Sequence, residues 1–523
     1  MAGEAPLILG VSGLRGIVGE TFTPEVAVRY AEAVAWWLRK TRLLEDDGSL
    51  ASGGPTDLSV VVARDGRAGG EVFYHAVISA LLGSGCDVLP IGVAMTPTVA
   101  CTVDLFGANA AVIVTASHNP SEWNGLKVVA EGALSDEADD EVGDQDDVVE
   151  LGCCAPPAEQ AELLVQAFQE ARSARVAPQF AGRMVPYRVD AVESHADLIL
   201  QMVSGMDDGA PFDLLKNRRI VTDSVNASGG RACRVLAGKV GLDLVQLGGD
   251  DSGLFQHTPE PTAANLSGDG GLCDTVVGAK AAVGFAQDPD ADRLAIVDER
   301  GRYIGEEYTL VLAAWRLLLD EQDHPSGTPV ICVNLSTSRM IDDLASKFGA
   351  EVVRTAVGEA NVVQAMKRAI GTGRNVLMGG EGNGGVIWHP ACVVRDSLGS
   401  MALVLSLMAR TGKTVSELVA EIDAMASGGK GGGYAIVKRK VDIPSKDAAA
   451  PAVEAVAEAY ADQTIDRQDG VRVDWDDAPH GGGAAWLHVR ASNTEPIMRL
   501  IAEAGSAAQA EAILDAAAGV IGG

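Results

Sequence analysis

The chain has 523 residues, of which 47% are hydrophobic, and its formal net charge is −31. A chain of this length is too long for one hydrophobic core, so we expect three or four domains. A surface of such negative charge repels phosphate groups, and we therefore expect neither nucleic acid nor an anionic membrane as a partner. An anionic substrate must be bound by cations that are gathered locally.

The N-terminal segment MAGEAPLILGVSG has neither the basic leader nor the long apolar core of a signal peptide. No stretch of the sequence approaches the roughly 18 apolar residues that a membrane span needs. The eight cysteines are scattered without a C-x-x-C pair, so we expect neither a zinc site nor a disulfide framework. Free thiols suit a reducing compartment, and we expect a cytoplasmic protein.

Three segments share one order of strand, polar loop, helix, glycine turn and strand: residues 58–92, 218–248 and 329–358. Their turns, LLGSGCDVL, LAGKVGLDL and LASKFGAEV, are alike in sequence. Each segment is typical of a βαβ unit, in which a glycine closes the helix. We therefore predict three copies of one α/β topology.

Residues 110–128, AAVIVTASHNPSEWNGLKV, predict a buried parallel strand that ends in a polar loop. The end of this strand delivers Ser117 and His118 to the rim of a sheet, where α/β folds bind ligands. No G-x-S-x-G elbow or Asp-His relay surrounds Ser117, but His118 and Lys127 could neutralise an anion. From these residues alone, Ser117 is either a functional hydroxyl or the N-cap of a helix.

Residues 284–299, GFAQDPDADRLAIVDE, place Asp288, Asp290 and Asp292 at alternating positions of a loop that precedes a predicted strand. Three carboxylates in an extended loop can converge on one hard cation, such as Mg²⁺. An EF-hand calcium loop that starts at Asp288 would have Glu299 at its twelfth position. Such a loop requires glycine at its sixth position, where this sequence has Arg293. An aspartyl-phosphate nucleophile motif requires threonine or valine where Asp292 stands. We predict a metal site.

Residues 375–388, NVLMGGEGNGGVIW, predict a strand followed by a glycine-rich loop around Glu381 and Asn383. Glycines let the backbone approach a ligand closely. A carboxylate and an amide together suit the hydroxyl groups of a sugar. A plain flexible turn is the alternative.

Residues 486–500, WLHVRASNTEPIMRL, bring together a guanidinium, two hydroxyls and an amide within five residues: Arg490, Ser492, Asn493 and Thr494. Such a group can bind an anion. A capping box from Ser492 and Glu495 is the alternative. Because IMRLIAE looks extended and not helical, we favour a phosphate-binding loop.

The spacing of these features predicts four domains. We assign residues 1–187 to an α/β domain with the serine loop, 188–303 to one with the metal loop, and 304–427 to one with the sugar loop. Residues 428–523 follow a glycine-rich linker and predict a smaller α+β domain with four strands and an alanine-rich helix from about Ser506. The acidic run at 135–150 is interpreted as a solvated surface insertion.

Taken in this order, the loops TASHNP, DPDADR, GGEGNGG and RASNTEP resemble those of the α-D-phosphohexomutases, a family that includes phosphoglucomutases, phosphomannomutases and phosphoglucosamine mutases. The opening GVSGLRG resembles the family's N-terminal active-site turn, which implies that Arg15 contacts the phosphoserine or the substrate. The resemblance covers essentially the whole chain apart from the acidic run. It implies three similar mixed α/β domains and a smaller C-terminal α+β domain around a central cleft.

The resemblance also implies a mechanism and a role for each loop. Ser117 would carry a phosphoryl group beside one Mg²⁺ ion held by Ser117 and the three aspartates, and a hexose 1,6-bisphosphate would be the intermediate. Lys127 and His118 would assist proton transfer, in roles that the sequence leaves open, and Arg293 would add a cation. Glu381 and Asn383 would bind sugar hydroxyls, and residues 490–494 would bind the phosphate that does not react. The segment TAVGEANV adds Glu359 as a weaker candidate.

For the reaction, we expect the interconversion of hexose 6-phosphate and hexose 1-phosphate by a phosphoglucosamine mutase. Phosphomannomutase and phosphoglucomutase are the close alternatives. A non-catalytic sugar-phosphate binding protein and a Mg²⁺-dependent phosphatase with an aspartyl nucleophile are alternatives of other classes. Small-molecule sugar phosphates are the expected partners, and the protein is expected to be a monomer or a homodimer.

Overall fold

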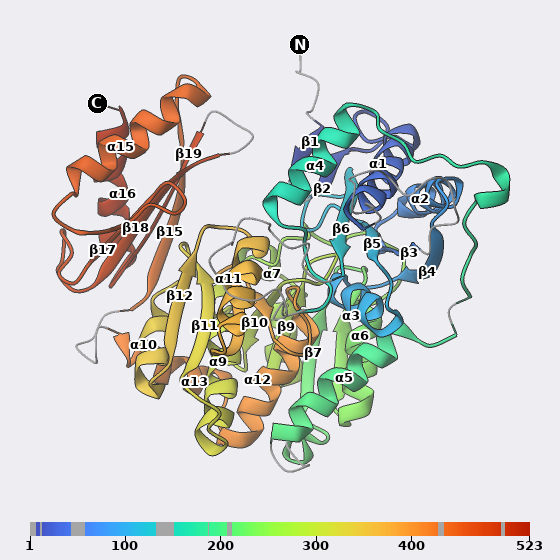
Figure 1. Cartoon of the computed structure of the whole chain (residues 1–523). Helices are drawn as coiled ribbons and strands as arrows, with labels where there is room; N and C mark the ends of the chain where they lie inside the picture. Colours follow the sequence, from blue (N-terminus) through green and yellow to red (C-terminus); the bar gives the residue numbers. More distant parts are fainter. Residues whose placement is uncertain are drawn as a thin grey trace.

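The computed structural model describes residues 7–10, 13–42, 58–131, 151–186, 188–206, 212–426, 433–492 and 497–522. Four sheets succeed one another along the chain. In Figure 1 the second and third sheets lie side by side in the lower half, with the first sheet at upper right and the fourth at upper left. The predicted fold class is confirmed. The acidic run at 135–150 lies outside the described residues.

The first sheet has six strands in the order β1-β2-β6-β5-β3-β4. Its strands are β1 (Ile8–Gly10), β2 (Gly13–Ile17), β3 (Ser59–Arg64), β4 (Asp87–Val93), β5 (Ala110–Val114) and β6 (Trp123–Ala130). Its helices are α1 (Pro24–Arg42), α2 (Gly70–Gly83), α3 (Thr96–Phe106) and α4 (Ala158–Gln169).

The second and third sheets have four strands each. The second contains β7 (Arg219–Asp223), β8 (Asp243–Leu247), β9 (Val283–Gln287) and β10 (Leu294–Asp298), with α5 (Ala191–Met206), α6 (Gly229–Val240), α7 (Ala263–Leu266) and α8 (Leu272–Ala279). The third contains β11 (Pro329–Asn334), β12 (Glu351–Thr355), β13 (Asn375–Glu381) and β14 (Gly385–Ile387), with α9 (Glu306–Asp323), α10 (Met340–Phe348), α11 (Glu359–Gly371), α12 (Ser397–Thr411) and α13 (Val415–Asp423).

These three sheets share one topology, as the similar turn sequences of the three βαβ segments predict. In each, a βαβ unit supplies two parallel strands: β3 and β4, β7 and β8, β11 and β12. A third strand, β5, β9 or β13, lies parallel on the other side of the first. It then turns back into an antiparallel partner, β6, β10 or β14. Gly241 and Gly349 close the helices of the second and third units in the left-handed conformation, which an L-residue with a Cβ rarely adopts.

The fourth sheet is antiparallel, in the order β15-β19-β18-β17-β16. Its strands are β15 (Ala435–Asp442), β16 (Thr464–Asp466), β17 (Val471–Trp475), β18 (Ala485–Ala491) and β19 (Ile497–Ala504). Helices α15 (Ala449–Ala459) and α16 (Ala507–Gly522) pack against it (Figure 1). The four predicted strands and the alanine-rich helix are confirmed, while the short strand β16 and helix α15 were not predicted.

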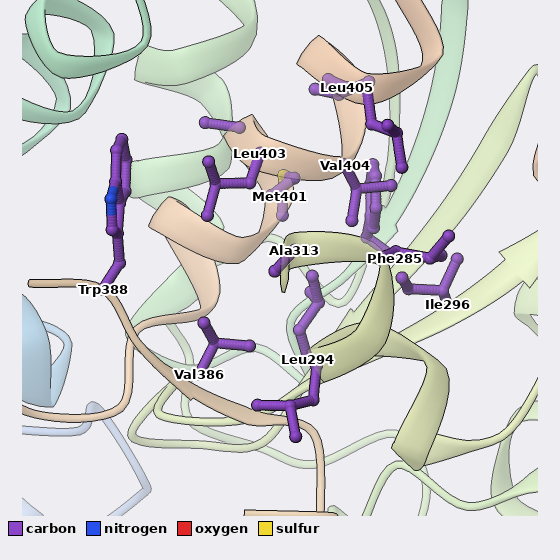
Figure 2. Close-up of a cluster of buried hydrophobic side chains, with 14 of the residues drawn as sticks. Phe285, Leu294, Ile296, Ala313, Val386, Trp388, Met401, Leu403, Val404 and Leu405 are labelled. Carbon is purple, nitrogen blue, oxygen red and sulfur yellow. The ribbon is translucent and has the colours of Figure 1, made fainter. Parts of the chain in front are cut away.

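One hydrophobic core lies between the second and third sheets. Phe285 and Ile296 of the second sheet and Val386 of the third belong to one cluster of buried side chains, with residues of α9 and α12. Figure 2 shows Leu403, Val404 and Leu405 of α12 among these side chains. Removing such apolar area from water contributes about 25 cal/mol per Å². The shared core therefore fixes the metal loop of the second sheet relative to the sugar loop of the third.

Candidate active site

The four loops of interest occupy corresponding places in the fold. The serine loop joins β5 to β6, the metal loop joins β9 to β10, and the sugar loop joins β13 to β14. Each connects the third strand of the repeated topology to its antiparallel partner. The phosphate loop likewise joins two antiparallel strands, β18 and β19. Each of the first three sheets therefore carries one of these loops at the equivalent position of its topology.

Ser117 is held by its backbone. Its φ is +50°, an uncommon conformation for a residue other than glycine, and its side chain is buried. The Ser117 N–H donates to Thr115 Oγ1 at 2.8 Å, and the Thr115 hydroxyl donates to Asp65 Oδ2 at 2.7 Å. Arg67 donates to the Ser117 carbonyl oxygen at 2.6 Å. The segment continues into strand β6, so the N-cap alternative is wrong.

The Ser117 hydroxyl points at the metal loop. Its Oγ donates to Asp288 Oδ2 at 3.1 Å, across 171 positions of sequence. His118 Nδ1 lies 3.3 Å from Ser117 Oγ. Burial lowers the pKa of His118 to about 3, with help from the nearby charges of Arg293 and Arg15. The imidazole beside the hydroxyl is therefore neutral at pH 7.

Asp288, Asp290 and Asp292 form the one group of potential metal ligands within the described part of the chain. One oxygen from each lies within 4.8 Å of the others, and all three side chains are fully buried. Burial raises the pKa of Asp288 well above its usual range, and the charges of Asp290 and Asp292 raise it further. Such crowding of buried negative charge is unfavourable without a cation.

The carboxylate oxygens divide into paired and unpaired ones. Oδ2 of Asp290 accepts from Thr96 Oγ1 at 2.9 Å, and Oδ2 of Asp292 accepts from Lys127 Nζ at 3.0 Å. Within the described residues, Oδ1 of Asp290 and Oδ1 of Asp292 are buried without any hydrogen-bond donor. Buried carboxylate oxygens without donors are costly, and they are the ligands that a hard divalent cation prefers. The residues therefore fit a metal ion.

The EF-hand alternative is wrong. Strand β10 begins directly after the three aspartates, and it carries Glu299 away from them. Glu299 instead accepts hydrogen bonds from the backbone N–H and the hydroxyl of Ser416. The twelfth position of the motif therefore cannot join the aspartates around one cation.

Four cationic side chains surround the three aspartates. Lys127 Nζ lies 3.6 Å from Asp290 in addition to its contact with Asp292, and Arg293 Nε lies 3.8 Å from Asp292 Oδ1. Burial lowers the pKa of Lys127, but Asp292, Glu359 and Asp290 outweigh it and raise the pKa above its ordinary value. Arg15 donates to Asn119 Oδ1 of the serine loop at 2.9 Å. The fourth cation, Arg395, was not identified from the sequence.

The sugar loop connects to the metal loop through Arg395. Arg395 donates to Glu381 Oε2 at 2.9 Å and to Asp292 Oδ2 at 2.6 Å. Asn383 donates to Glu381 Oε2 at 3.4 Å, and its own Oδ1 accepts from the N–H of Gly385. Glu381 and Asn383 therefore lie in one network with the metal loop.

Arg490 belongs to a separate network. Its Nε donates to Asp469 Oδ2 at 2.9 Å, and the same oxygen accepts from the N–H of Val357 at 3.2 Å. This places Arg490 beside the segment that leads to Glu359. The N–H of Ser492 donates to the carbonyl oxygen of Ile497, and because strand β19 follows, the capping-box alternative is wrong. Asn493 and Thr494 lie outside the described residues.

Sequence reasoning missed the residues that hold the site in place. Asp65 and Arg67 follow strand β3, and Asn334, which donates to Glu381 Oε1 at 2.9 Å, ends strand β11. The rule that identified Ser117, that ligands bind where parallel strands end, could have found all three. Arg395 had no comparable signal, because it stands eight residues beyond the end of β14 in the segment ACVVRDS. Its contacts are with three segments that are distant in the sequence, so they become visible only in the folded chain.

Four family models match this chain. The three models described as phosphoglucomutase/phosphomannomutase alpha/beta/alpha domains I, II and III match residues 6–146, 211–301 and 305–425. The model of the C-terminal domain matches residues 436–520. This chain belongs to the phosphoglucomutase/phosphomannomutase family. It is thus a phosphohexomutase, an isomerase that transfers phosphoryl groups.

Relatives and solved structures extend over the whole chain. A protein of Methanopyrus kandleri named "Probable phosphoglucosamine mutase" is 33% identical over 97% of this chain and 96% of its own length. A "Phosphoglucomutase/phosphomannomutase" of Thermococcus kodakarensis is 30% identical over 97% of both chains. A crystal structure of a family member from Burkholderia thailandensis is similar with a TM-score of 0.72, at 23% identity over 97% of this chain and 96% of that chain.

Among the described residues, no helix combines the length and the apolar character that a membrane span needs.

Proposed function

We propose that this phosphohexomutase interconverts glucosamine 6-phosphate and glucosamine 1-phosphate through a phosphorylated Ser117, with one Mg²⁺ held by the three aspartates and Ser117. The contact of 3.1 Å between Ser117 Oγ and Asp288 carries the proposal, because it joins the hydroxyl to one of the three carboxylates that could hold a metal ion. The sugar assignment is supported by the Methanopyrus relative. Mannose and glucose phosphates are the second candidates, supported by the name of the Thermococcus relative.

When bound, Mg²⁺ supplies a Lewis acid that offsets negative charge on a phosphoryl group during transfer. The protein positions the groups that react. The φ of Ser117 and the bond from Arg67 direct the Ser117 oxygen toward Asp288. A sugar hydroxyl forms a bond to phosphorus as the bond from phosphorus to Ser117 Oγ breaks; the hydroxyl proton passes to a nearby base, and Ser117 Oγ takes up a proton. The resulting hexose 1,6-bisphosphate turns over in the site. Ser117 Oγ then gives up its proton and bonds to the other phosphorus, and the sugar oxygen that is released takes up a proton.

We propose that His118 and Lys127 assist the proton transfers. His118 Nδ1 lies 3.3 Å from Ser117 Oγ, and Lys127 Nζ lies 3.0 Å from Asp292. Arg15 and Arg293 add positive charge that a phosphorylated serine and a sugar phosphate would need. Glu381 and Asn383 are proposed to bind the sugar hydroxyls. Arg490, Ser492, Asn493 and Thr494 are proposed to bind the phosphate group that does not react.

The proposal is tested by mass spectrometry of Ser117 and by kinetics. We expect a phosphoryl group on the peptide that contains Ser117, and loss of mutase activity in Ser117→Ala. A phosphoryl group on an aspartate would instead support the phosphatase alternative. Catalysis that survives in Ser117→Ala would exclude the phosphoserine mechanism, and wild-type binding without turnover would support a non-catalytic binding protein.

The sugar is tested by comparing kcat/KM for the 1-phosphates and 6-phosphates of glucosamine, mannose and glucose. We expect glucosamine phosphates to give the highest values. A higher value for mannose or glucose phosphates would replace the sugar assignment and leave the mechanism intact.

A further inference from the structure

Arg395 occupies the junction of three loops. It lies between β14 and α12, and only 10% of its side chain is exposed. Its guanidinium pairs with Asp292 of the metal loop at 2.6 Å, with Glu381 of the sugar loop at 2.9 Å and with Glu359 at the start of α11 at 3.2 Å. Burial lowers the pKa of Arg395, but the three carboxylates and Asp290 outweigh it and raise the pKa well above its ordinary value. The charge is therefore permanent.

The contact with Asp292 involves one of its two carboxylate oxygens. Arg395 and Lys127 both donate to Oδ2 of Asp292, at 2.6 and 3.0 Å. Oδ1 accepts no hydrogen bond from the described residues. Because two donors hold Oδ2, the carboxylate cannot rotate freely, and Oδ1 stays available as a metal ligand. Partners that orient a ligand in this way commonly affect metal affinity or activity by about 10-fold to 100-fold.

The contact with Glu381 fixes the sugar loop. Arg395 donates to Oε2, while Asn334 Nδ2 and the N–H of Gly358 donate to Oε1 at 2.9 and 3.2 Å. These donors come from three separate segments, so the direction of the carboxylate depends on all of them. The one arginine that orients Asp292 thus also orients the proposed sugar carboxylate.

The chain around Arg395 is built to hold this position. A Cβ at Gly385 would collide with Cδ of Arg395, so the absence of a side chain at Gly385 makes room for the arginine stem. The next residue, Asp396, caps α12 by accepting from the N–H of Leu398 at 2.8 Å and also contacts His195 at 3.2 Å. The helix that begins next to Arg395 therefore anchors its backbone, and the space left at Gly385 accommodates its side-chain stem.

We propose that Arg395 is a positioning residue that orients the metal carboxylate Asp292 and the sugar carboxylate Glu381 together, so that magnesium and sugar-phosphate affinity depend on the same side chain. This rests on the proposed function for the roles of Asp292 and Glu381. The planar fork of arginine presents several N–H donors in a fixed geometry and can pair with three carboxylates at once, whereas the ammonium of lysine is a point charge on a flexible stem. A lysine at this position would keep the charge and lose the shared orientation.

The test compares Arg395→Lys and Arg395→Gln with wild type in two measurements. The first is the dissociation constant of Mg²⁺ alone, from calorimetry on the metal-free protein. The second is KM and kcat for glucosamine 6-phosphate at saturating Mg²⁺. The matched control is Arg316→Lys, which changes a fully buried arginine whose Nε donates to Ser406 at 2.7 Å, outside the contacts of the site.

We expect the Mg²⁺ dissociation constant and the KM of glucosamine 6-phosphate each to rise at least about 10-fold in both Arg395 variants, and to change less than twofold in the control. If Arg395→Gln does not fold, Arg395→Lys decides the matter. Values within twofold of wild type in folded Arg395→Lys would overturn the proposal, and a change in only one constant would overturn the shared role. A wild-type protein that turns over no hexose phosphate would instead refute the proposed function, while the Mg²⁺ titration still reports on Arg395 and Asp292.

Discussion

Arg67 and Ser117 lie 50 positions apart in the sequence, yet Nη2 of Arg67 donates to the carbonyl oxygen of Ser117 at 2.6 Å. The same guanidinium donates to the carbonyl oxygen of Trp123 at 2.5 Å and to Asp65 Oδ2 at 2.9 Å. One buried arginine therefore fixes both ends of the serine loop against strand β3. The Ser117 hydroxyl reaches Asp288 because its backbone is held this firmly.

Arg67→Lys is expected to lower kcat about 100-fold, because a small displacement of a reacting oxygen can cost this much. The KM for sugar phosphate should change little, since among the described residues the hydrogen bonds of Arg67 go to Asp65 and the serine loop and not to the sugar loop. The loss of buried hydrogen bonds should also lower the free energy of unfolding by about 1–3 kcal/mol. Steady-state kinetics and urea unfolding measure both effects.

The control for this prediction is Arg39→Lys. Arg39 also donates to a backbone carbonyl in the first part of the chain, that of Ser84 at 2.6 Å. This bond is not one of those that hold the serine loop. The control should lose stability without a comparable fall in kcat. An equal fall in kcat for both variants would mean that the effect of Arg67 comes from general destabilisation.

Magnesium should stabilise the folded protein through the three aspartates. At a concentration about 100 times its dissociation constant, a ligand that binds only the folded state adds about 2.7 kcal/mol. We expect thermal unfolding of the wild type to shift upward with MgCl₂ relative to EDTA, and Asp290→Asn to show little or no shift. Asp243→Asn, which removes an exposed carboxylate paired with Arg219, is the control for lost charge. A full Mg²⁺ shift in Asp290→Asn would exclude the triad as the binding site.

The sequence predicted the loops better than the contacts between them. The strand before Ser117 and the strand after Asp292 follow from local patterns of β-branched and apolar residues, and both are present as β5 and β10. The pairing of Ser117 with Asp288 depends on how the first two sheets pack, which no local pattern encodes. Short β16 was missed because its three residues, TID, offer too little alternation to predict a strand.

The domain boundaries and the roles of the site residues stay predictions. Arg395 shows why such roles are hard to assign from sequence. Asp292 and Glu359 lie 103 and 36 positions away from Arg395, and only the folded chain brings them both into ion pairs with its guanidinium. Local motifs identify groups that do chemistry, whereas the groups that orient them are defined by tertiary packing.

Glu307 gives the protein a pH-dependent stability. It lies on α9, is buried, and accepts from the N–H of Ser338 at 3.0 Å. Burial raises its pKa from 4.5 to about 8, so the folded protein holds a proton that the unfolded chain releases. The stability of the folded state should therefore fall as the pH rises between about 4.5 and 8, by up to about 1.4 kcal/mol per pH unit.

Glu307→Gln should remove this dependence. The amide oxygen can still accept from Ser338, and it has no proton to release. We expect the free energy of unfolding of the variant, relative to wild type, to increase between pH 5 and pH 8 in chemical denaturation. Glu306→Gln, which changes the adjacent and more exposed carboxylate that pairs with Lys438, is the control and should lack this trend. A difference that does not vary with pH would show that Glu307 ionises normally in the folded protein.

A second pH effect, of different origin, is expected at His195. This fully buried side chain on α5 contacts Thr98 Oγ1 of α3 at 2.9 Å and Oδ2 of Asp396 at 3.2 Å. The other oxygen of Asp396, Oδ1, caps α12. His195 therefore joins helices that are associated with three different sheets. Burial lowers its pKa, but the charge and hydrogen bond of Asp396 outweigh burial and raise the pKa above 6.5.

Because the folded state favours protonated His195, the stabilisation is complete below about pH 6.5 and is lost as the pH rises through the raised pKa. We expect His195→Gln to be less stable than wild type at pH 6, and this deficit to shrink at pH 8 to 9. Urea unfolding at a series of pH values measures the deficit, and His75→Gln, at an exposed position on α2, should show none. A deficit that stays constant from pH 5.5 to 9 would show that His195 acts by packing and neutral hydrogen bonds, with no contribution from its charge.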